Sequence, residues 1–136
     1  MMKIKFILFL FVFFYYKSFG LCSLKIDKNE LRTIYTIDVT VYNPDPSQCN
    51  ADYLHTADMS FIDTTRINEL MWCAISRDLL QDINYSDTII LFNNDTVANE
   101  WIVHDCMNVR FKNRVDLLQS KKGLYGKWSN IKFYKK

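Results

Sequence analysis

The chain has 136 residues, of which 49% are hydrophobic and 24% are charged, with a formal net charge of +2 at pH 7. A chain of this length can bury one hydrophobic core but is small enough to benefit from covalent cross-links. It contains no repeat and no low-complexity tract, and only 3 glycines and 2 prolines. The composition therefore excludes a linker-rich, multidomain protein and indicates one compact unit.

Residues 1–20 have the pattern of a secretory signal peptide. Lys3 and Lys5 form a basic start, residues 4–16 are almost entirely apolar, and Ser18 and Gly20 are small residues suited to cleavage. The alternative is a membrane anchor, but the apolar run is shorter than the roughly 20 residues of a spanning helix. We therefore expect cleavage after Gly20, no membrane span in the mature chain, and a secreted, extracellular protein.

Loss of residues 1–20 leaves an uneven charge distribution. Residues 21–109 hold 5 basic and 14 acidic side chains, whereas residues 110–136 hold 9 basic side chains and one acid, Asp116. The basic and aromatic C-terminal tail, residues 122–136, can fold back onto the acidic body or bind an anionic partner. We expect the first of these, a solvated tail neutralised by its own protein, and no nucleic-acid partner.

The clearest local signal is a strand over residues 33–42. This segment is rich in β-branched and aromatic residues, and Ile37, Val39 and Val41 alternate with polar neighbours. Asn43-Pro44-Asp45-Pro46 ends it, and Asp45 and Pro46 can start a helix over about 46–56. Residues 57–72 are expected to be extended or irregular.

Helices are expected over most of the rest of the chain. The pattern favours one over 73–81, one from Asn94 or Asp95 to about Arg110, and a short one over 113–121 that ends at Gly123. In the second of these, Ala98, Ile102 and Cys106 recur at helical spacing and form an apolar stripe. These expectations give an α+β fold class, a small, mostly helical domain with a minor β region.

The four cysteines, Cys22, Cys49, Cys73 and Cys106, suit an oxidising compartment and allow three pairings, among which the sequence does not choose. Two N-glycosylation acceptors, Asn84 and Asn94, occur in Asn-X-Ser/Thr sequences. In a secreted chain these acceptors would lie on the surface.

Several short motifs occur in an informative order. They are Cys22-Ser23-Leu24, Cys49-Asn50-Ala51-Asp52, Arg66-Ile67-Asn68-Glu69-Leu70-Met71-Trp72-Cys73, Asp78-Leu79-Leu80-Gln81-Asp82-Ile83 and Trp101-Ile102-Val103-His104-Asp105-Cys106. Together they resemble the c-type lysozymes, which are glycoside hydrolases, and the related α-lactalbumins. The resemblance covers residues 21–120 and implies that residues 21–136 form a disulfide-bonded lysozyme-like domain. The strand at 33–42 departs from the family, which has a helix and loop there.

The resemblance implies a disulfide between Cys49 and Cys106 and leaves Cys22 and Cys73 unassigned, because their usual partners are absent. It also puts the two catalytic carboxylates of the family at positions that here hold Leu54 and Phe61, neither of which can transfer a proton. The nearest substitutes are Asp52 and Asp63, which fit only if the alignment shifts.

The remaining candidate residues predict neither a cofactor nor a metal site. His55 lies next to Leu54 and can titrate near neutrality, but a lone helix histidine is more often a packed or surface residue. His104 has no ligand set for zinc around it. The segment that corresponds to the calcium loop of α-lactalbumin holds only two carboxylates, Asp82 and Asp87.

Three functions follow from these observations. The first is a secreted lysozyme-like pseudoenzyme that has lost muramidase chemistry and binds a glycan, of the peptidoglycan or chitin type, or a protein partner. The second is an active, divergent lysozyme that hydrolyses β-1,4 glycosidic bonds of peptidoglycan. The third is an unrelated disulfide-bonded secreted effector. A Cys22–Cys49 plus Cys73–Cys106 pairing would support this third function.

Overall fold

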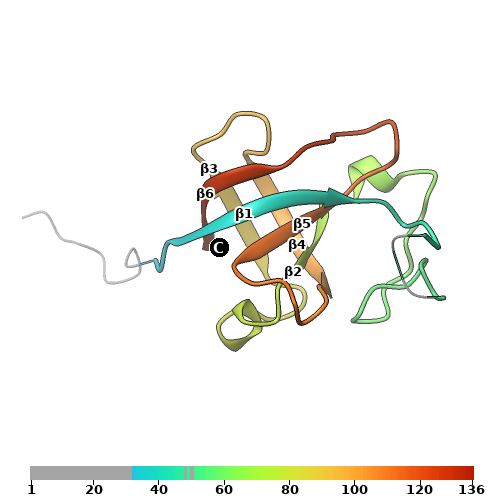
Figure 1. Cartoon of the computed structure of the whole chain (residues 1–136), viewed down its shortest axis with the longest axis horizontal. Coiled ribbons are helices and arrows are strands. Elements are labelled where there is room, and N and C mark those ends of the chain that lie inside the picture. The colour runs from blue at the N-terminus through green and yellow to red at the C-terminus, as the bar shows by residue number, and fades with distance from the viewer. Residues whose placement is uncertain (1–31, 48, 50) are drawn as a thin grey trace, which may run out of the picture. The chain divides into compact units, whose positions relative to one another are not determined.

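The computed structural model describes residues 32–47, 49 and 51–136 (Figure 1). The expected signal peptide at 1–20 and Cys22 lie outside these residues. No helix in the described ranges is long and apolar enough to cross a membrane.

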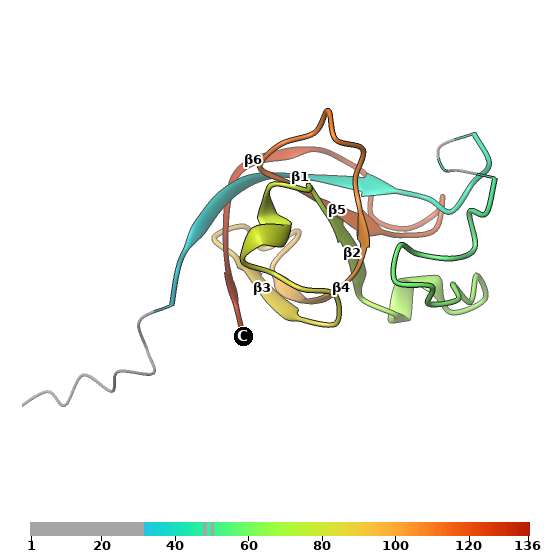
Figure 2. The ribbon, with the colours of Figure 1, turned by 90° about the horizontal axis from the view of Figure 1, so that it is seen from below.

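The described chain forms a closed barrel of β-strands. Around the barrel the strands follow the order β1-β5-β2-β4-β3-β6. Their bounds are β1 (Tyr35–Tyr42), β2 (Trp72–Ile75), β3 (Thr88–Phe92), β4 (Asn99–Cys106), β5 (Arg114–Leu118) and β6 (Trp128–Lys135), with single-turn 3-10 helices η2 (Ile67–Glu69) and η3 (Leu79–Gln81). The β1–β5 and β2–β4 pairs are parallel and the other four pairs are antiparallel. Figure 2 shows the strands curving around one interior.

The barrel interior is filled by one residue in two along each strand. On β1 these are Ile37 and Val39, as the alternation in the sequence predicts, and Leu91, Val103 and Phe133 fill it from other strands. Each of these five side chains is at most 3% exposed. The strand expected over 33–42 is therefore confirmed.

A smaller apolar cluster lies outside the barrel, beneath the long connection from β1 to β2. Ile62 and Ile67 of this connection pack with Leu118 of β5, and Tyr42 and Trp72 flank them. This cluster ties the connection to the outer face of the barrel, which is where the candidate site lies.

The expected mostly helical α+β fold is wrong. The 73–81 segment holds β2 and η3, the 94–110 segment holds β4, the 113–121 segment holds β5, and no α-helix occurs over 46–56 among its described residues. In β4 the buried residues are Trp101 and Val103, which alternate with their neighbours. β4 pairs with a strand on each side, and this long-range pairing outweighs the weak helical stripe of Ala98, Ile102 and Cys106.

The expected disulfide is also wrong. Cys49, Cys73 and Cys106 are free thiols in the structure. Cys73 lies in the barrel interior with no exposed surface, where it packs as a small apolar residue. A disulfide-bonded lysozyme-like scaffold is thus replaced by a barrel that closes through strand pairing.

The basic C-terminal tail lies against the acidic body, but it is not the solvated tail that the sequence favours, because most of it forms a strand of the barrel. Lys121 pairs with Asp45, Lys127 with Asp38, Lys135 with Asp87, and Lys136 with Glu100. Residues 128–135 form β6, which pairs with β1 and β3 and closes the barrel. Trp128 packs against the core, whereas Tyr125 is 91% exposed and does not.

Candidate functional site: a carboxylate pair on the outer face of the barrel

Two carboxylates from different strands lie at the same level of the sheet. Ala74 of β2 is the register partner of Asp116 on β5 and also of Asp105 on β4. Strands separated by one intervening strand are about 9.5 Å apart, so the two acids flank β2 closely enough to influence each other. The residue between them is Ala74, which has a small side chain and is 4% exposed, so neighbouring groups cover it.

A bulge in β4 directs Asp105 to this face. The register between β2 and β4 shifts between Cys73 and Ala74. As a result His104, whose ring lies 4.2 Å from that of Trp72, and Asp105, which opposes Ala74, both lie on the outer side of the barrel. Without the bulge one of two successive residues would face the interior.

Asp116 is held as a weak acid. Burial raises its pKa to about 6, and the negative charge of Asp105 acts in the same direction. A hydrogen bond of 2.8 Å from the Thr40 hydroxyl and the charge of Arg114 oppose this rise without cancelling it. Thr40 is the register partner of Asp116 on β1, so the parallel β1–β5 pair fixes this contact.

Asp105 has more donors around it. Burial raises its pKa, but its Oδ1 accepts backbone N–H groups from Cys106 at 2.8 Å and from Ala57 at 3.0 Å, which favour the ionised form. The Tyr42 hydroxyl donates to its Oδ2 at 3.4 Å. Burial and nearby negative groups raise the pKa of Tyr42, so this hydroxyl stays protonated and remains a donor.

A third acid, Asp58, connects the β1–β2 connection to β4 through His104. Its Oδ2 lies 2.6 Å from Nδ1 of His104, with both side chains only 14% exposed. It also accepts bonds from the Thr56 hydroxyl at 2.6 Å and the Ser60 N–H at 3.0 Å. Burial raises the pKa of Asp58, but these hydrogen bonds outweigh burial and lower it to about 2. Asp58 is therefore a permanent anion.

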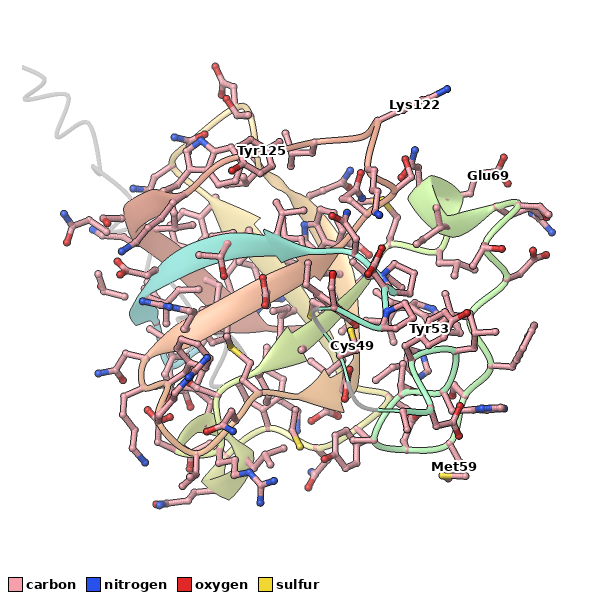
Figure 3. The ribbon with its side chains drawn as sticks, turned by 45° about the vertical axis from the view of Figure 1, so that its right-hand side comes forward. Cys49, Tyr53, Met59, Glu69, Lys122 and Tyr125 are labelled. Carbon is pink, nitrogen blue, oxygen red and sulfur yellow. The ribbon has the colours of Figure 1, made fainter. Side chains whose placement is uncertain are left out.

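Cys49 lies beside the same group. Burial raises its pKa, and the negative charges of Asp105 and Asp116 add to that effect. Figure 3 shows Cys49 against the barrel strands, with Tyr53 and Met59 on the connection beyond it. A thiol in such acidic surroundings is a poor nucleophile, so the chemistry of the site rests on its carboxylates.

The residues that sequence comparison with lysozymes singled out lie near this site but do not form it. Leu54 and Phe61 lie on opposite arms of a short hairpin, where the Leu54 carbonyl accepts the Ile62 N–H at 2.8 Å and Phe61 is the bridge partner of His55. Asp52 is exposed and bonds His55 at 2.8 Å. Asp63 accepts the N–H and hydroxyl of Thr65 in a local turn, and neither bond reaches the carboxylate pair.

Sequence reasoning missed Asp105 and Asp116 as site residues. One signal was available for Asp116, which is the single acid among the 9 basic residues of the last 27 positions, 110–136. No comparable local signal marks Asp105, because a strand bulge is set by long-range pairing.

Other features of the described residues give no alternative site. No group of three or more His, Cys, Asp or Glu side chains among them is arranged to hold a metal ion. Two hollows, one lined by Asp38 and Lys112 and the other by Arg66 and Glu69 with their neighbours, do not include the pair. The expected glycosylation acceptors Asn84 and Asn94 lie in turns outside the strands.

A scan against protein-family models finds no match to this sequence, and a search of curated proteins finds none either. These comparisons neither support nor oppose the resemblance to lysozymes. The barrel separates the chain from the fold that the resemblance implies, so the chemistry of the site must be argued from its own residues.

Proposed function

We propose that the protein is a secreted enzyme that cleaves glycosidic bonds in a β-1,4-linked aminosugar glycan of the peptidoglycan or chitin type. The observation that carries the proposal is the pair of partly buried carboxylates, Asp105 and Asp116, which share one level of the barrel but differ in their hydrogen bonds. Two acids whose environments differ in this way are the usual basis of acid–base glycosidase chemistry.

Asp116 acts as the general acid. With a pKa of about 6 it retains its proton in mildly acidic solution, whereas an ordinary aspartate would have lost it. It gives this proton to the bridging oxygen as the bond between that oxygen and the anomeric carbon breaks. The Thr40 hydroxyl keeps the carboxyl in one orientation during this transfer.

Asp105 acts in its ionised form, as the carboxylate that works together with the general acid Asp116. The N–H groups of Cys106 and Ala57 and the hydroxyl of Tyr42 stabilise its negative charge. That charge faces the positive charge that develops on the sugar ring, and it accepts a proton from the water that attacks the anomeric carbon. The strand separation of about 9.5 Å between the two acids lies at the upper end of the carboxyl spacing of inverting glycosidases.

The expected export suits a substrate outside the cell. Asp105 and Asp116 are both partly exposed on the outer face of the barrel, so a substrate can contact them there. The signal-peptide pattern of residues 1–20 supports an extracellular substrate.

The test is cleavage by the purified mature chain, residues 21–136, measured as clearing of a peptidoglycan suspension and as new reducing ends from chitin oligomers. We expect cleavage of at least one substrate, reduced by about 10²–10⁴-fold in Asp116→Asn, because the proton donor is lost. Asp95→Asn, at an exposed turn position, is the matched control and should retain full activity. Cleavage that persists in Asp116→Asn would refute the assigned role.

Binding without cleavage is the second candidate function. It is favoured by exposed apolar side chains on the hairpin whose Ala57 bonds Asp105, namely Met59 at 72% and Phe61 at 59% exposure. Under this alternative the wild-type chain retains peptidoglycan or chitin, or a protein partner, but releases no reducing ends.

A further inference from the structure

The short hairpin over residues 54–62 presents an outward face that the proposed chemistry does not use. Its two arms are joined by hydrogen bonds from the Ile62 N–H to the Leu54 carbonyl at 2.8 Å and from the Thr56 N–H to the Ser60 carbonyl at 3.1 Å. Thr56 and Ile62 point inward and are at most 3% exposed. His55 and Phe61, which are next to these two residues in the chain, are exposed and point outward.

Three outward side chains form an apolar ridge, defined here as His55, Met59 and Phe61. His55 and Phe61 are bridge partners whose rings meet edge to face, with centroids 5.5 Å apart. Met59 at the tip is 72% exposed and Phe61 is 59% exposed. Asp52 holds the His55 ring by a 2.8 Å contact, so the ridge has a polar edge as well as an apolar crest.

The ridge is held rigidly, in a conformation that costs free energy. Met59 has a φ of 70°, in the left-handed region that residues other than glycine, asparagine and aspartate seldom adopt. The turn that contains it is locked by Asp58, whose carboxylate bonds Thr56, Ser60 and His104. A strained, well-anchored backbone that exposes a large apolar side chain is typical of a binding site.

The ridge is also connected directly to the carboxylate pair. Ala57, two residues before Met59, donates its N–H to Asp105 at 3.0 Å. Since a residue spans at most ~3.6 Å of chain, the backbone of Met59 lies within about 7 Å of the backbone that holds Asp105. For a polymer, this is the distance of a neighbouring sugar unit rather than of the bond that is cleaved.

We propose that His55, Met59 and Phe61 form a sugar-binding subsite, which holds the β-1,4-linked N-acetylhexosamine backbone next to the carboxylate pair. The inference rests on the proposed function for the identity of the ligand. Apolar crest atoms cover the C–H faces of a pyranose ring, while Asp52 and His55 can bond its hydroxyl groups. A membrane surface fits less well, because Asp52, Asp58 and Asp63 put negative charge around the crest.

The test measures binding apart from cleavage. All proteins carry Asp116→Asn, and their retention on insoluble peptidoglycan and their titration with chitohexaose are compared. We expect Met59→Ser with Phe61→Ser to weaken binding by about tenfold or more on whichever probe the parent binds. The matched control is Tyr125→Ser, which removes a ring that is 91% exposed and that Figure 3 shows far from Met59.

Each outcome decides the inference. Equal binding by the parent and the ridge variant, or no binding of either glycan by the parent, would overturn the subsite. Retention on lipid vesicles that the ridge substitutions remove, without glycan binding, would replace it with a membrane contact. Thermal unfolding checks that the exposed substitutions leave the fold intact. Because cleavage is not measured, loss of glycan binding in the ridge variant supports the subsite even if the protein proves not to be an enzyme.

Discussion

At the scale of single residues, the site is defined by how many donors reach each carboxylate. Asp105 accepts two backbone N–H groups and a phenol, whereas Asp116 accepts one hydroxyl. Donors stabilise the ionised form, so the acid with fewer donors keeps its proton to higher pH. The roles of acid and carboxylate therefore follow from the hydrogen bonds, and they can be tested one residue at a time.

The first prediction concerns the pH dependence of cleavage. The general acid must be protonated, and the pKa of Asp116 is about 6, so kcat/KM should fall as the pH rises through that value. On the acidic side the rate should fall again as Asp105 takes up a proton, at a pH above that of an ordinary aspartate, because its pKa is raised. A rate profile over pH values from about 3 to 9 measures both limbs. A rate that keeps rising above pH ~7 would contradict the assignment of Asp116 as the acid.

The second prediction concerns stability. Because the folded pKa of Asp116 is raised from 3.8 to about 6, its stabilising contribution is present below pH 3.8 and is lost as the pH rises through about 6. Asp116→Asn removes the cost of the buried charge, so the variant should be about 1–3 kcal/mol more stable than wild type at neutral pH. The difference should shrink in acid.

Denaturant unfolding of both proteins at two pH values measures this difference. Asp95→Asn, an exposed substitution, should show no such pH-dependent gain. If Asp116→Asn were destabilising at neutral pH, the carboxylate would have to be stabilised by partners other than Thr40.

At the scale of elements, the site depends on one bulge and one hairpin. The bulge in β4 lets His104 and Asp105 face outward together, and the 54–62 hairpin then reaches both, since Asp58 bonds His104 and Ala57 bonds Asp105. Ala57 and Asp58 are consecutive in the hairpin, and His104 and Asp105 are consecutive in β4. Loosening the hairpin at Asp58 should therefore also release a donor from Asp105.

The third prediction is that Asp58→Asn lowers both stability and activity. Loss of the charge weakens the bonds to Thr56, Ser60 and His104, which we expect to cost about 1–3 kcal/mol. Without the Ala57 donor, the acidic limb of the rate profile should move to higher pH. Thermal unfolding and the pH profile measure the two effects.

A matched control comes from the next aspartate along the chain. Asp63 also accepts the N–H and hydroxyl of a residue two positions later, but in a local turn without a bond to β4. Asp63→Asn should leave the rate profile unchanged. An equal shift in both variants would mean that the hairpin as a whole, rather than the contact of Asp58 with β4, sets the state of Asp105.

Local patterns predicted some of these elements and not others. Residues 33–42 alternate so strongly that only a strand fits, and β1 is found there. In 94–110 the helical spacing of Ala98, Ile102 and Cys106 competes with the alternation of Trp101 and Val103, and only pairing with β2 and β3 decides for a strand. The site is less predictable still, because Asp105 and Asp116 meet only through the register of β2.

The lysozyme-like motifs point to the 54–62 hairpin, but not because it carries catalytic residues. Leu54 and Phe61 do lie on the hairpin whose Ala57 N–H bonds Asp105. The resemblance to lysozymes puts the two catalytic carboxylates at these positions, and their replacement by Leu54 and Phe61 predicts an inactive protein. In a barrel those positions carry no such meaning, and the acids come instead from β4 and β5.

At the scale of the whole molecule, stability comes from barrel closure and charge balance. β6 pairs with β1 and β3 and contributes Ile131 and Phe133 to the core, so the last strand of the chain completes the barrel. The lysines of the tail pair with acids of the body at partly exposed positions, where each pair contributes at most about 1 kcal/mol. The fold therefore rests on its core rather than on cross-links.

The last prediction is that the folded protein does not need a disulfide within residues 32–136. Cys49, Cys73 and Cys106 are free, and Cys73 has no exposed surface, with its pKa raised by burial. Reductant should therefore leave the melting temperature unchanged, and a thiol reagent should modify Cys49 and Cys106 in the native state but Cys73 only after unfolding. Peptide mass mapping after alkylation identifies each site. A Cys49–Cys106 disulfide, or a loss of about 3–5 kcal/mol on reduction, would instead support the cross-linked scaffold that the sequence motifs implied.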